Sequence, residues 1–153
     1  MLYLREAGPE DMMLLFDWAN DPTVRMQAFY TQQIPFEDHR NWFIKILADR
    51  DTLQYILCDS TLKENQAIGQ IRLAIEDKKA LISYSVDKNR RGQGLGARMV
   101  LMAEEQLKQK RTDVIECIAQ VKTDNVASAR VFEKCGYDVD VCEKYFEFTK
   151  RIR

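Results

Sequence analysis

The sequence predicts an α/β fold in which a mixed, mostly antiparallel central sheet carries helices on both faces. The chain has 153 residues, of which 46% are hydrophobic, and this suits a single domain over residues 1–153. Segments with a hydrophobic period of two alternate with segments of helical period. Several strands follow one another directly in the middle of the chain, and a strand–helix–strand unit comes after them.

The N-terminal part is expected to form one strand and two helices. Residues 2–6 form the strand, and Gly8-Pro9-Glu10-Asp11 starts the first helix, because proline and acidic side chains suit a first turn. Asp21-Pro22 ends this helix, and the second helix starts after Pro35. The expected apolar faces comprise Met12, Leu15, Phe16 and Ala19 in the first helix and Phe36, Phe43, Ile46 and Leu47 in the second.

Three strands are expected next, at residues 53–57, 71–75 and 82–86. Apolar and other residues alternate in them, most clearly in the last two. Asp77-Lys78-Lys79 lies between these two strands and is typical of a hairpin turn. These segments therefore predict an antiparallel run.

The C-terminal half is expected to contain two helices and two strand segments. A helix runs from about Gly94 to Gln109, and residues 114–121 form an apolar strand. Residues 125–135 form a short helix, which Gly136 ends in a left-handed conformation. Residues 139–149 form a last strand or hairpin, rich in aromatic residues. This edge favours pairing with a second copy in a homodimer, although edge strands have other fates.

Composition excludes several classes of protein. The formal net charge is −1, so the basic excess of a nucleic-acid-binding protein is absent. The N-terminus does not resemble a signal peptide, and no apolar stretch reaches the roughly 20 residues that span a membrane. We therefore expect a cytoplasmic protein. No metal site is expected, because His39 is the one histidine and the scattered cysteines are typical of reduced thiols: Cys58, Cys117, Cys135 and Cys142.

The segment Arg91-Gly92-Gln93-Gly94-Leu95-Gly96 lies between an expected strand and an expected helix. Glycines let backbone N–H groups approach an anion, and a helix start adds free N–H donors with a partial positive charge. Lys88, Arg90 and Arg98 add formal charge around the segment. The pattern favours a pyrophosphate site, and the alternative is a plain glycine-rich turn.

Two common glycine motifs do not fit this segment. A P-loop requires GxxxxGK[ST], which the chain lacks. A dinucleotide-binding fold requires G-x-G-x-x-G after the first strand, whereas here the spacing is G-x-G-x-G and the segment lies past mid-chain. The ligand is therefore expected to be a different pyrophosphate compound.

A second segment, from Asn125 to Tyr137, combines an asparagine at a helix start with a helix that ends in Lys-x-Gly-aromatic. Together the two segments resemble the GNAT family of N-acetyltransferases. The first matches the family's [RQ]-x-x-G-x-[GA] acyl-CoA signature, and the second matches its N-x(6)-[YF]-x-K-x-G-[FY] segment. The order of strands and helices fits the family over essentially the whole chain.

The resemblance implies acetyl-CoA as cosubstrate. The loop would bind the pyrophosphate through backbone amides, and pantetheine would lie where the strand ending at Val86 splays from the strand at 114–120. Asn125 would contact the CoA arm, while its position also suits a helix N-cap. The expected cofactor-binding residues are Val86, Arg91, Gly92, Gln93, Gly94, Leu95, Gly96, Ala97, Asn125 and Phe132.

The family's chemistry is direct attack of an amine on the thioester. A backbone N–H near Ser85 and Val86 would stabilise the oxyanion. The tyrosine that usually acts as the acid is Phe132 here. Thiolate is a fair leaving group, since a thiol has a pKa of about 8.5, so activity need not depend on this acid. Tyr137 and Tyr145 are the alternatives.

The general base is left open among four residues. His39 has an ordinary pKa close to neutrality, which suits proton transfer, although it is equally typical of a solvated helix position. The other candidates are Glu76, Glu37 and Ser83.

Two N-terminal segments bear on the acceptor. Trp18–Arg25 and Glu37–Phe43 are similar to a branch that acetylates nucleotide-linked amino sugars, as in pseudaminic-acid pathways, with its W-x-N-[DE]-x-x-[VI]-R stretch. Arginine pairs with phosphate and aromatic faces stack on rings. The expected substrate-binding residues are Trp18, Asn20, Arg25, His39 and Tyr84.

Other interpretations remain beside this one. Trp18 and Trp42 also suit plain core positions. The ribosomal-protein N-terminal acetyltransferases share a similar helical opening, so a protein α-amine or a polyamine is the second candidate acceptor. A non-catalytic acyl-CoA-binding module is the third hypothesis, and Phe132 is its main support.

Overall fold

The computed structural model describes the backbone of residues 1–153 and the side chains apart from that of Asn65. Its strands form one sheet in the order β1-β2-β3-β4-β5-β7-β6. Neighbouring strands are antiparallel except for the parallel pair β4–β5, so the predicted mixed, mostly antiparallel sheet is confirmed. The strands are β1 (Leu2–Glu6), β2 (Thr52–Asp59), β3 (Gln66–Glu76), β4 (Lys79–Val86), β5 (Glu116–Lys122), β6 (Asp138–Val141) and β7 (Tyr145–Arg151).

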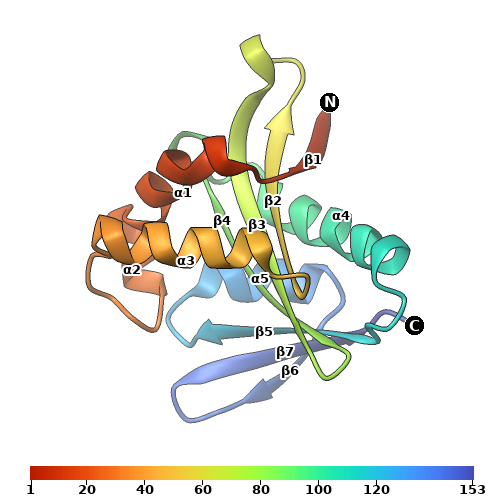
Figure 1. The fold of residues 1–153 in the computed structure, drawn as a ribbon. Coiled ribbons are helices and arrows are strands. Elements are labelled where there is room, and N and C mark those ends of the chain that lie inside the picture. The colour runs from red at the N-terminus through yellow and green to blue at the C-terminus, as the bar shows by residue number, and fades with distance from the viewer.

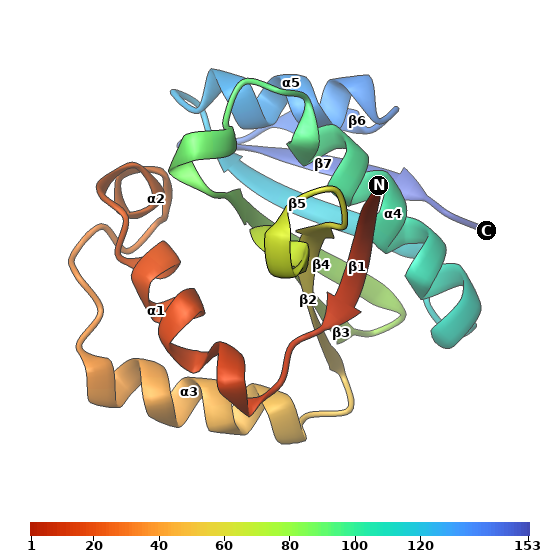
Figure 2. The ribbon, with the colours of Figure 1, turned by 90° about the horizontal axis from the view of Figure 1, so that it is seen from above.

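Helices cover both faces of this sheet, as predicted (Figures 1 and 2). α1 (Met12–Ala19) and α3 (Phe36–Ala48) lie on one face, with α2 (Pro22–Gln27) beside α1. α4 (Leu95–Lys110) and α5 (Val126–Lys134) lie on the other face. The arrangement sandwiches the sheet between two helical layers.

Each face has its own core. On the α4 side a large cluster fills the space between sheet and helices, with Met99, Val100 and Leu107 fully buried. On the α1–α3 side a smaller cluster contains Leu15, Phe43, Ile46, Ile56 and Cys58. The smaller core leaves part of its sheet face to polar side chains, which are described below.

The turn before α1 and the break after it differ in outcome. Pro9–Asp11 form a 3-10 turn that leads into α1, where the sequence predicts a helix start. Asp21-Pro22 does end α1, but a further helix, α2, begins at Pro22 and is absent from the prediction. The same dipeptide carries both signals, because Asp21 caps the N–H groups of Thr23 and Val24 and proline suits a first turn.

The apolar side of α3 is narrower than the sequence predicts. Phe43 and Ile46 are buried, whereas Phe36 and Leu47 are each 38% exposed. Phe36 instead packs edge-on against Phe16 of α1, with ring centroids 5.3 Å apart. α3 therefore contacts the sheet along one narrow stripe.

β4 and β5 splay apart, as the resemblance implies. Their parallel pairing extends from Lys79 and Glu116 to Leu81 and Ile118, and it stops there. β5 continues its pairing with β7 as far as Lys122 and Tyr145. Figure 1 shows the two strands diverging toward the side of the molecule that carries α2.

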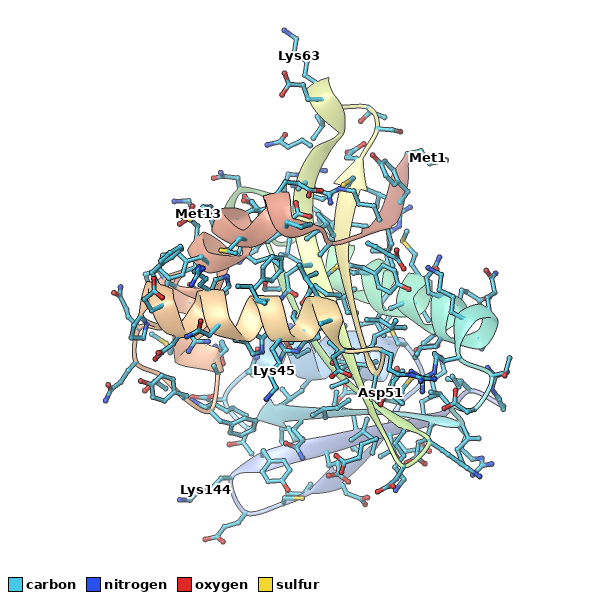
Figure 3. The ribbon with its side chains drawn as sticks, viewed as in Figure 1. Met1, Met13, Lys45, Asp51, Lys63 and Lys144 are labelled. Carbon is cyan, nitrogen blue, oxygen red and sulfur yellow. The ribbon has the colours of Figure 1, made fainter. Side chains whose placement is uncertain are left out.

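The outer edge of the sheet is β6, where Val139 is 46% and Val141 is 76% exposed. Lys63 and Lys144 mark the tips of the β2–β3 and β6–β7 connections, which extend away from the body of the molecule (Figure 3). The homodimer expected at this edge stays a prediction. No helix in the described part of the chain is long and apolar enough to cross a membrane.

Candidate functional site

A cavity of about 1060 Å³ starts between the diverging ends of β4 and β5 and continues beneath the N-terminal helices. We call the part lined by β4, β5, α5 and the loop before α4 the glycine-loop half. We call the part lined by α1, α2, α3 and the facing strands the helix half. Both halves belong to one continuous space, so ligands bound in them can meet.

The edge of β4 offers unpaired backbone groups to this space. Asp87 donates its N–H to Ile68 across the β3 side, at 2.9 Å. Because N–H groups of an antiparallel strand alternate in direction, Ser85 also faces β3, while Tyr84 and Val86 face the gap. Of the two predicted oxyanion donors, the Val86 N–H is therefore the one that points toward the gap.

The glycine loop is open on its outer side. Gly92 and Gly94 have φ of 77° and 74°, which residues with a side chain rarely adopt. A Cβ added at either position would meet nothing within 4 Å. Gly94 precedes the first turn of α4, whose N–H groups are free to bind an anion. The loop therefore fits a pyrophosphate.

Gly96 has a different reason to be glycine. It lies inside α4, and an added Cβ would come within 3.1 Å of the Tyr84 ring and 3.2 Å of Val131. Its missing side chain lets α4 pack close to β4 and α5. The predicted loop residues Gln93 and Ala97 do not line the cavity, since Ala97 is buried in the core and Arg90 binds the Gln93 side chain at 3.1 Å.

Arg91 connects the loop to other elements. Its Nε donates to the carbonyl of Val86 at 3.2 Å, and its Nη2 donates to Oδ1 of Asp21 at 3.2 Å. Burial alone would raise the pKa of Asp21, but the bonds from Arg91 and from the α2 backbone outweigh it and lower that pKa. The pair thus remains charged at neutral pH.

Asn125 fits both of its predicted roles. It precedes α5, and its Oδ1 accepts the N–H of Ser128 at 3.2 Å, which is an N-cap. The residue also lines the glycine-loop half of the cavity. A second side-chain contact remains available to a ligand there.

Phe132 lies at the inner wall of the same half and is 2% exposed. Tyr84, which the sequence predicts as a substrate contact, packs against it with centroids 6.0 Å apart. The Tyr84 hydroxyl is 2.9 Å from the Ser128 hydroxyl, and burial raises the pKa of Tyr84. Tyr84 thus keeps its proton at neutral pH and lies in the glycine-loop half.

The two tyrosines proposed as substitute acids do not line the cavity. Tyr137 is buried and donates to Oε2 of Glu104 at 2.8 Å, and burial raises its pKa strongly. Tyr145 packs edge-on against Phe29 at 5.9 Å, at the start of β7. Their placement argues against the acid role for both.

His39 is buried at 2% exposure and lines the helix half. Its Nε2 lies 3.1 Å from the carbonyl of Met12, which can only accept, so Nε2 carries the proton and Nδ1 is a free acceptor. Burial lowers the pKa of His39, although the bond to Met12 acts in the other direction. The interpretation of His39 as a solvated helix residue is wrong.

The other candidate bases divide by position. Glu76 lies opposite Lys79 at the hairpin end of β3, outside the cavity, so its predicted catalytic role is wrong. Glu37 is exposed on α3 and pairs with Arg40 at 3.6 Å, also outside the cavity. Ser83 lines the helix half.

The residues of the Trp18–Arg25 segment mainly shape the helix half. Trp18 lines it and donates its Nε1–H to Asp87 at 3.0 Å. Asn20 does not line it, because its amide bonds both the N–H and the carbonyl of Ile34, at 2.7 and 3.0 Å. Arg25 lines it but already donates to the carbonyls of Ala19 and Tyr30, at 2.6 and 2.7 Å. These bonds fix the 28–35 loop, so the predicted substrate roles of Asn20 and Arg25 give way to structural ones.

Several lining residues are absent from the prediction. Polar side chains form the floor of the helix half on β2, β3 and β4. Gln54 donates to Gln70 at 2.8 Å, and Gln70 donates to the Ser85 hydroxyl at 3.0 Å. Polar residues that alternate with the apolar face of a strand covered by helices are the signal that would have found them. The missed residues are Gln27, Asp38, Gln54, Gln70 and Arg72.

In the described part of the chain, no group of three or more His, Cys, Asp or Glu side chains is arranged to hold a metal ion. The groups that converge on the cavity are backbone amides, hydroxyls, aromatic rings, one neutral imidazole and guanidinium groups. Such a set suits binding of a pyrophosphate compound in one half and proton transfer in the other.

The sequence profile of the family described as acetyltransferase (GNAT) domain matches residues 1–138. None of the curated protein sequences compared with the chain matches it. Solved structures share the fold at low sequence identity. Spermidine N-acetyltransferase from Vibrio cholerae, in complex with CoA and spermine, has a TM-score of 0.80 at 15% identity, covering 98% of this chain and 92% of that one.

Two further structures show the same likeness. A ribosomal L7/L12 α-N-protein acetyltransferase in complex with coenzyme A has a TM-score of 0.81 at 18% identity, covering 98% of this chain and 93% of that one. The aminoglycoside acetyltransferase AAC(6')-Ib, in complex with paromomycin and acetyl-CoA, has a TM-score of 0.82 at 16% identity, with coverage of 98% and 93%. At these identities the likeness supports the fold alone.

Proposed function

Because the chain belongs to the acetyltransferase (GNAT) domain family and is an acetyl-CoA-dependent N-acetyltransferase, we propose that its acceptor is the primary amine of a nucleotide-linked amino sugar. The helix half of the cavity carries this proposal. It combines aromatic faces with polar floor residues and is joined directly to the glycine-loop half.

The glycine-loop half is the proposed acetyl-CoA site. The amides of Gly92, Gly94 and the first turn of α4 would bind the pyrophosphate, with Arg91 and Asn125 beside them. Acetyl-CoA supplies a thioester, whose acetyl group passes to the amine while the thiol is released. The Val86 N–H is the donor that would bind the thioester carbonyl and its developing negative charge.

Proton transfer would involve one residue in each half. His39 is neutral and has a free Nδ1, so it is the proposed general base for the acceptor ammonium, directly or through water. Tyr84 carries a proton in the glycine-loop half, beside Phe132, and is the proposed donor to the departing thiolate. Its contribution is expected to be modest, since thiolate leaves readily.

The charges of the helix half favour this acceptor over a polyamine. Among the described lining residues, Asp38 is the one carboxylate, whereas Arg25 and Arg72 lie on the same walls. A polyamine with several positive charges would require a more acidic site. Trp18 and Trp42 offer faces on which a sugar or base ring can stack.

The test is an acetylation assay with a panel of acceptors. The protein is incubated with acetyl-CoA and several UDP-linked 4-amino-sugars, and thiol release is followed together with the mass of the product. Release with at least one of these sugars, at a kcat/KM well above that for spermidine or a peptide with a free N-terminus, supports the proposal. Release only with the peptide or the polyamine contradicts it. Tight CoA binding without turnover on any amine would instead indicate the non-catalytic module.

A further inference from the structure

Arg72 of β3 has the environment of a residue that binds an anion. It lines the helix half of the cavity, opposite Ser83 on β4. Its guanidinium lies over the ring of Trp42, with 5.1 Å between Cζ and the ring centroid. Strand, tryptophan and serine together fix the position of the charge.

Most of the hydrogen-bonding capacity of Arg72 is unused. A guanidinium offers five N–H donors. The side chain makes one hydrogen bond within the described residues, from Nη2 to the Ser83 hydroxyl at 3.3 Å. Its nitrogen atoms are not among the buried, unpartnered atoms of the described side chains, so those without a partner remain reachable from the cavity.

The neighbouring arginines of the cavity are engaged. Arg91 pairs with Asp21 and Arg90 pairs with Asp59. Arg25 donates to backbone carbonyls. Within the part of the chain that the structure describes, no carboxylate lies within 4.0 Å of the Arg72 guanidinium.

A charged group withdrawn from water is costly unless an opposite charge or hydrogen bonds compensate it. Burial lowers the pKa of Arg72, which reports the same cost, yet arginine stays protonated in proteins. The contact with Trp42 offsets only part of this cost. An anionic group of a ligand would supply the rest, and the planar guanidinium suits the paired oxygens of phosphate or carboxylate.

We infer that Arg72 binds an oxyanion of the acceptor, a phosphate or a carboxylate group, while the amine of the same molecule faces the glycine-loop half. The acceptor is thus an amine that also carries negative charge. This rests on the proposed function only in taking the helix half as the acceptor site, and it restricts which amines can occupy that half.

The experiment uses probes without an amine, so its outcome does not depend on turnover. The protein is first saturated with CoA, which occupies the glycine loop. It is then titrated by calorimetry with UDP and with D-glucuronate, each beside its uncharged counterpart, uridine or D-glucose. The variant is Arg72→Gln, and the matched control is Arg40→Gln, which removes the same charge from the exposed side of α3 outside the cavity.

The expected result is that wild-type protein and Arg40→Gln bind at least one anionic probe, and that Arg72→Gln binds it roughly ten- to thirty-fold more weakly. Uridine and D-glucose should show no such difference. A larger loss for UDP assigns the oxyanion to phosphate, and a larger loss for D-glucuronate assigns it to carboxylate.

Equal affinity of both anionic probes for wild type and Arg72→Gln, or no anionic probe bound by wild type, would overturn the inference. If Arg72→Gln does not fold, Arg72→Lys replaces it, because lysine keeps the charge but loses the paired donors, and an intermediate loss is expected. Failure of the acetylation assay with UDP-amino-sugars would leave the binding result intact, so the two hypotheses fail separately.

Discussion

Asp21 and Arg91 connect the N-terminal helices to the glycine loop, with 3.2 Å between Asp21 Oδ1 and Arg91 Nη2. The same carboxylate oxygen caps α2 by accepting from Thr23 and Val24. The wall of the acceptor site and the loop that would bind CoA are thus held by one carboxylate.

Arg91→Gln should weaken CoA binding by roughly three- to ten-fold, because it removes a positive charge and a donor beside the loop while the backbone amides remain. The free energy of unfolding should fall by less than about 1 kcal/mol, since the ion pair is partly exposed. Calorimetric titration with CoA and thermal unfolding measure the two effects. Unchanged CoA affinity would mean that Arg91 serves only the contact with Asp21.

Gly94→Ala should destabilise the protein and weaken CoA binding together. Alanine at a φ of 74° costs about 1–2 kcal/mol, and relief of this strain would shift the loop and the first turn of α4. Gly136→Ala is the matched control, because Gly136 has a φ of 88° but lies outside the cavity. Both variants should lose similar thermal stability, and only Gly94→Ala should lose CoA affinity. Equal loss of CoA affinity in both would show that the effect is general destabilisation.

The order of strands and helices could be predicted because it depends on local hydrophobic periods and on turn residues. The position of α2 could not, since Asp21-Pro22 signals a helix end and a helix start alike. The glycine loop and Asn125 could be found because backbone binding of a pyrophosphate requires a local motif.

The acceptor half escapes such prediction because its residues come together only through the sheet register. Gln70 meets Ser85 and Arg72 meets Ser83 across the β3–β4 ladder, and no local pattern contains these pairs. Arg25 illustrates the reverse error. An arginine near aromatic residues suggests a phosphate contact, but the chain folds so that loop carbonyls occupy its donors.

Tyr84→Phe should lower kcat by up to about tenfold and leave CoA affinity nearly unchanged, because it removes a proton donor to the thiolate but keeps the ring beside Phe132. Tyr137→Phe is its counterpart. It should leave kcat unchanged but lower stability by about 1–3 kcal/mol, since the buried Glu104 loses a hydrogen bond. Steady-state kinetics and thermal unfolding of both variants distinguish the roles. A loss of kcat in Tyr137→Phe alone would reverse the assignment.

His39 should give the enzyme an acid limb in its pH–rate profile. Only the neutral imidazole can accept a proton, and burial places the pKa below its ordinary value of about 6.5. The acid limb of kcat/KM should therefore lie below pH 6.5. The same shift contributes stability that is complete above about pH 6.5 and is lost as the pH falls through the lower folded-state pKa, because the unfolded chain binds the proton more readily.

His39→Gln separates these two effects, because glutamine can still donate to the Met12 carbonyl but cannot act as a base. The variant should lose about 10²–10⁴-fold in kcat/KM at neutral pH, and its acid limb should disappear. Its thermal stability should also stop declining in the pH range where the wild type loses the His39 contribution. A variant that keeps the wild-type acid limb, with reduced stability alone, would show that His39 only positions α1 against α3 and that the base is another group in the helix half.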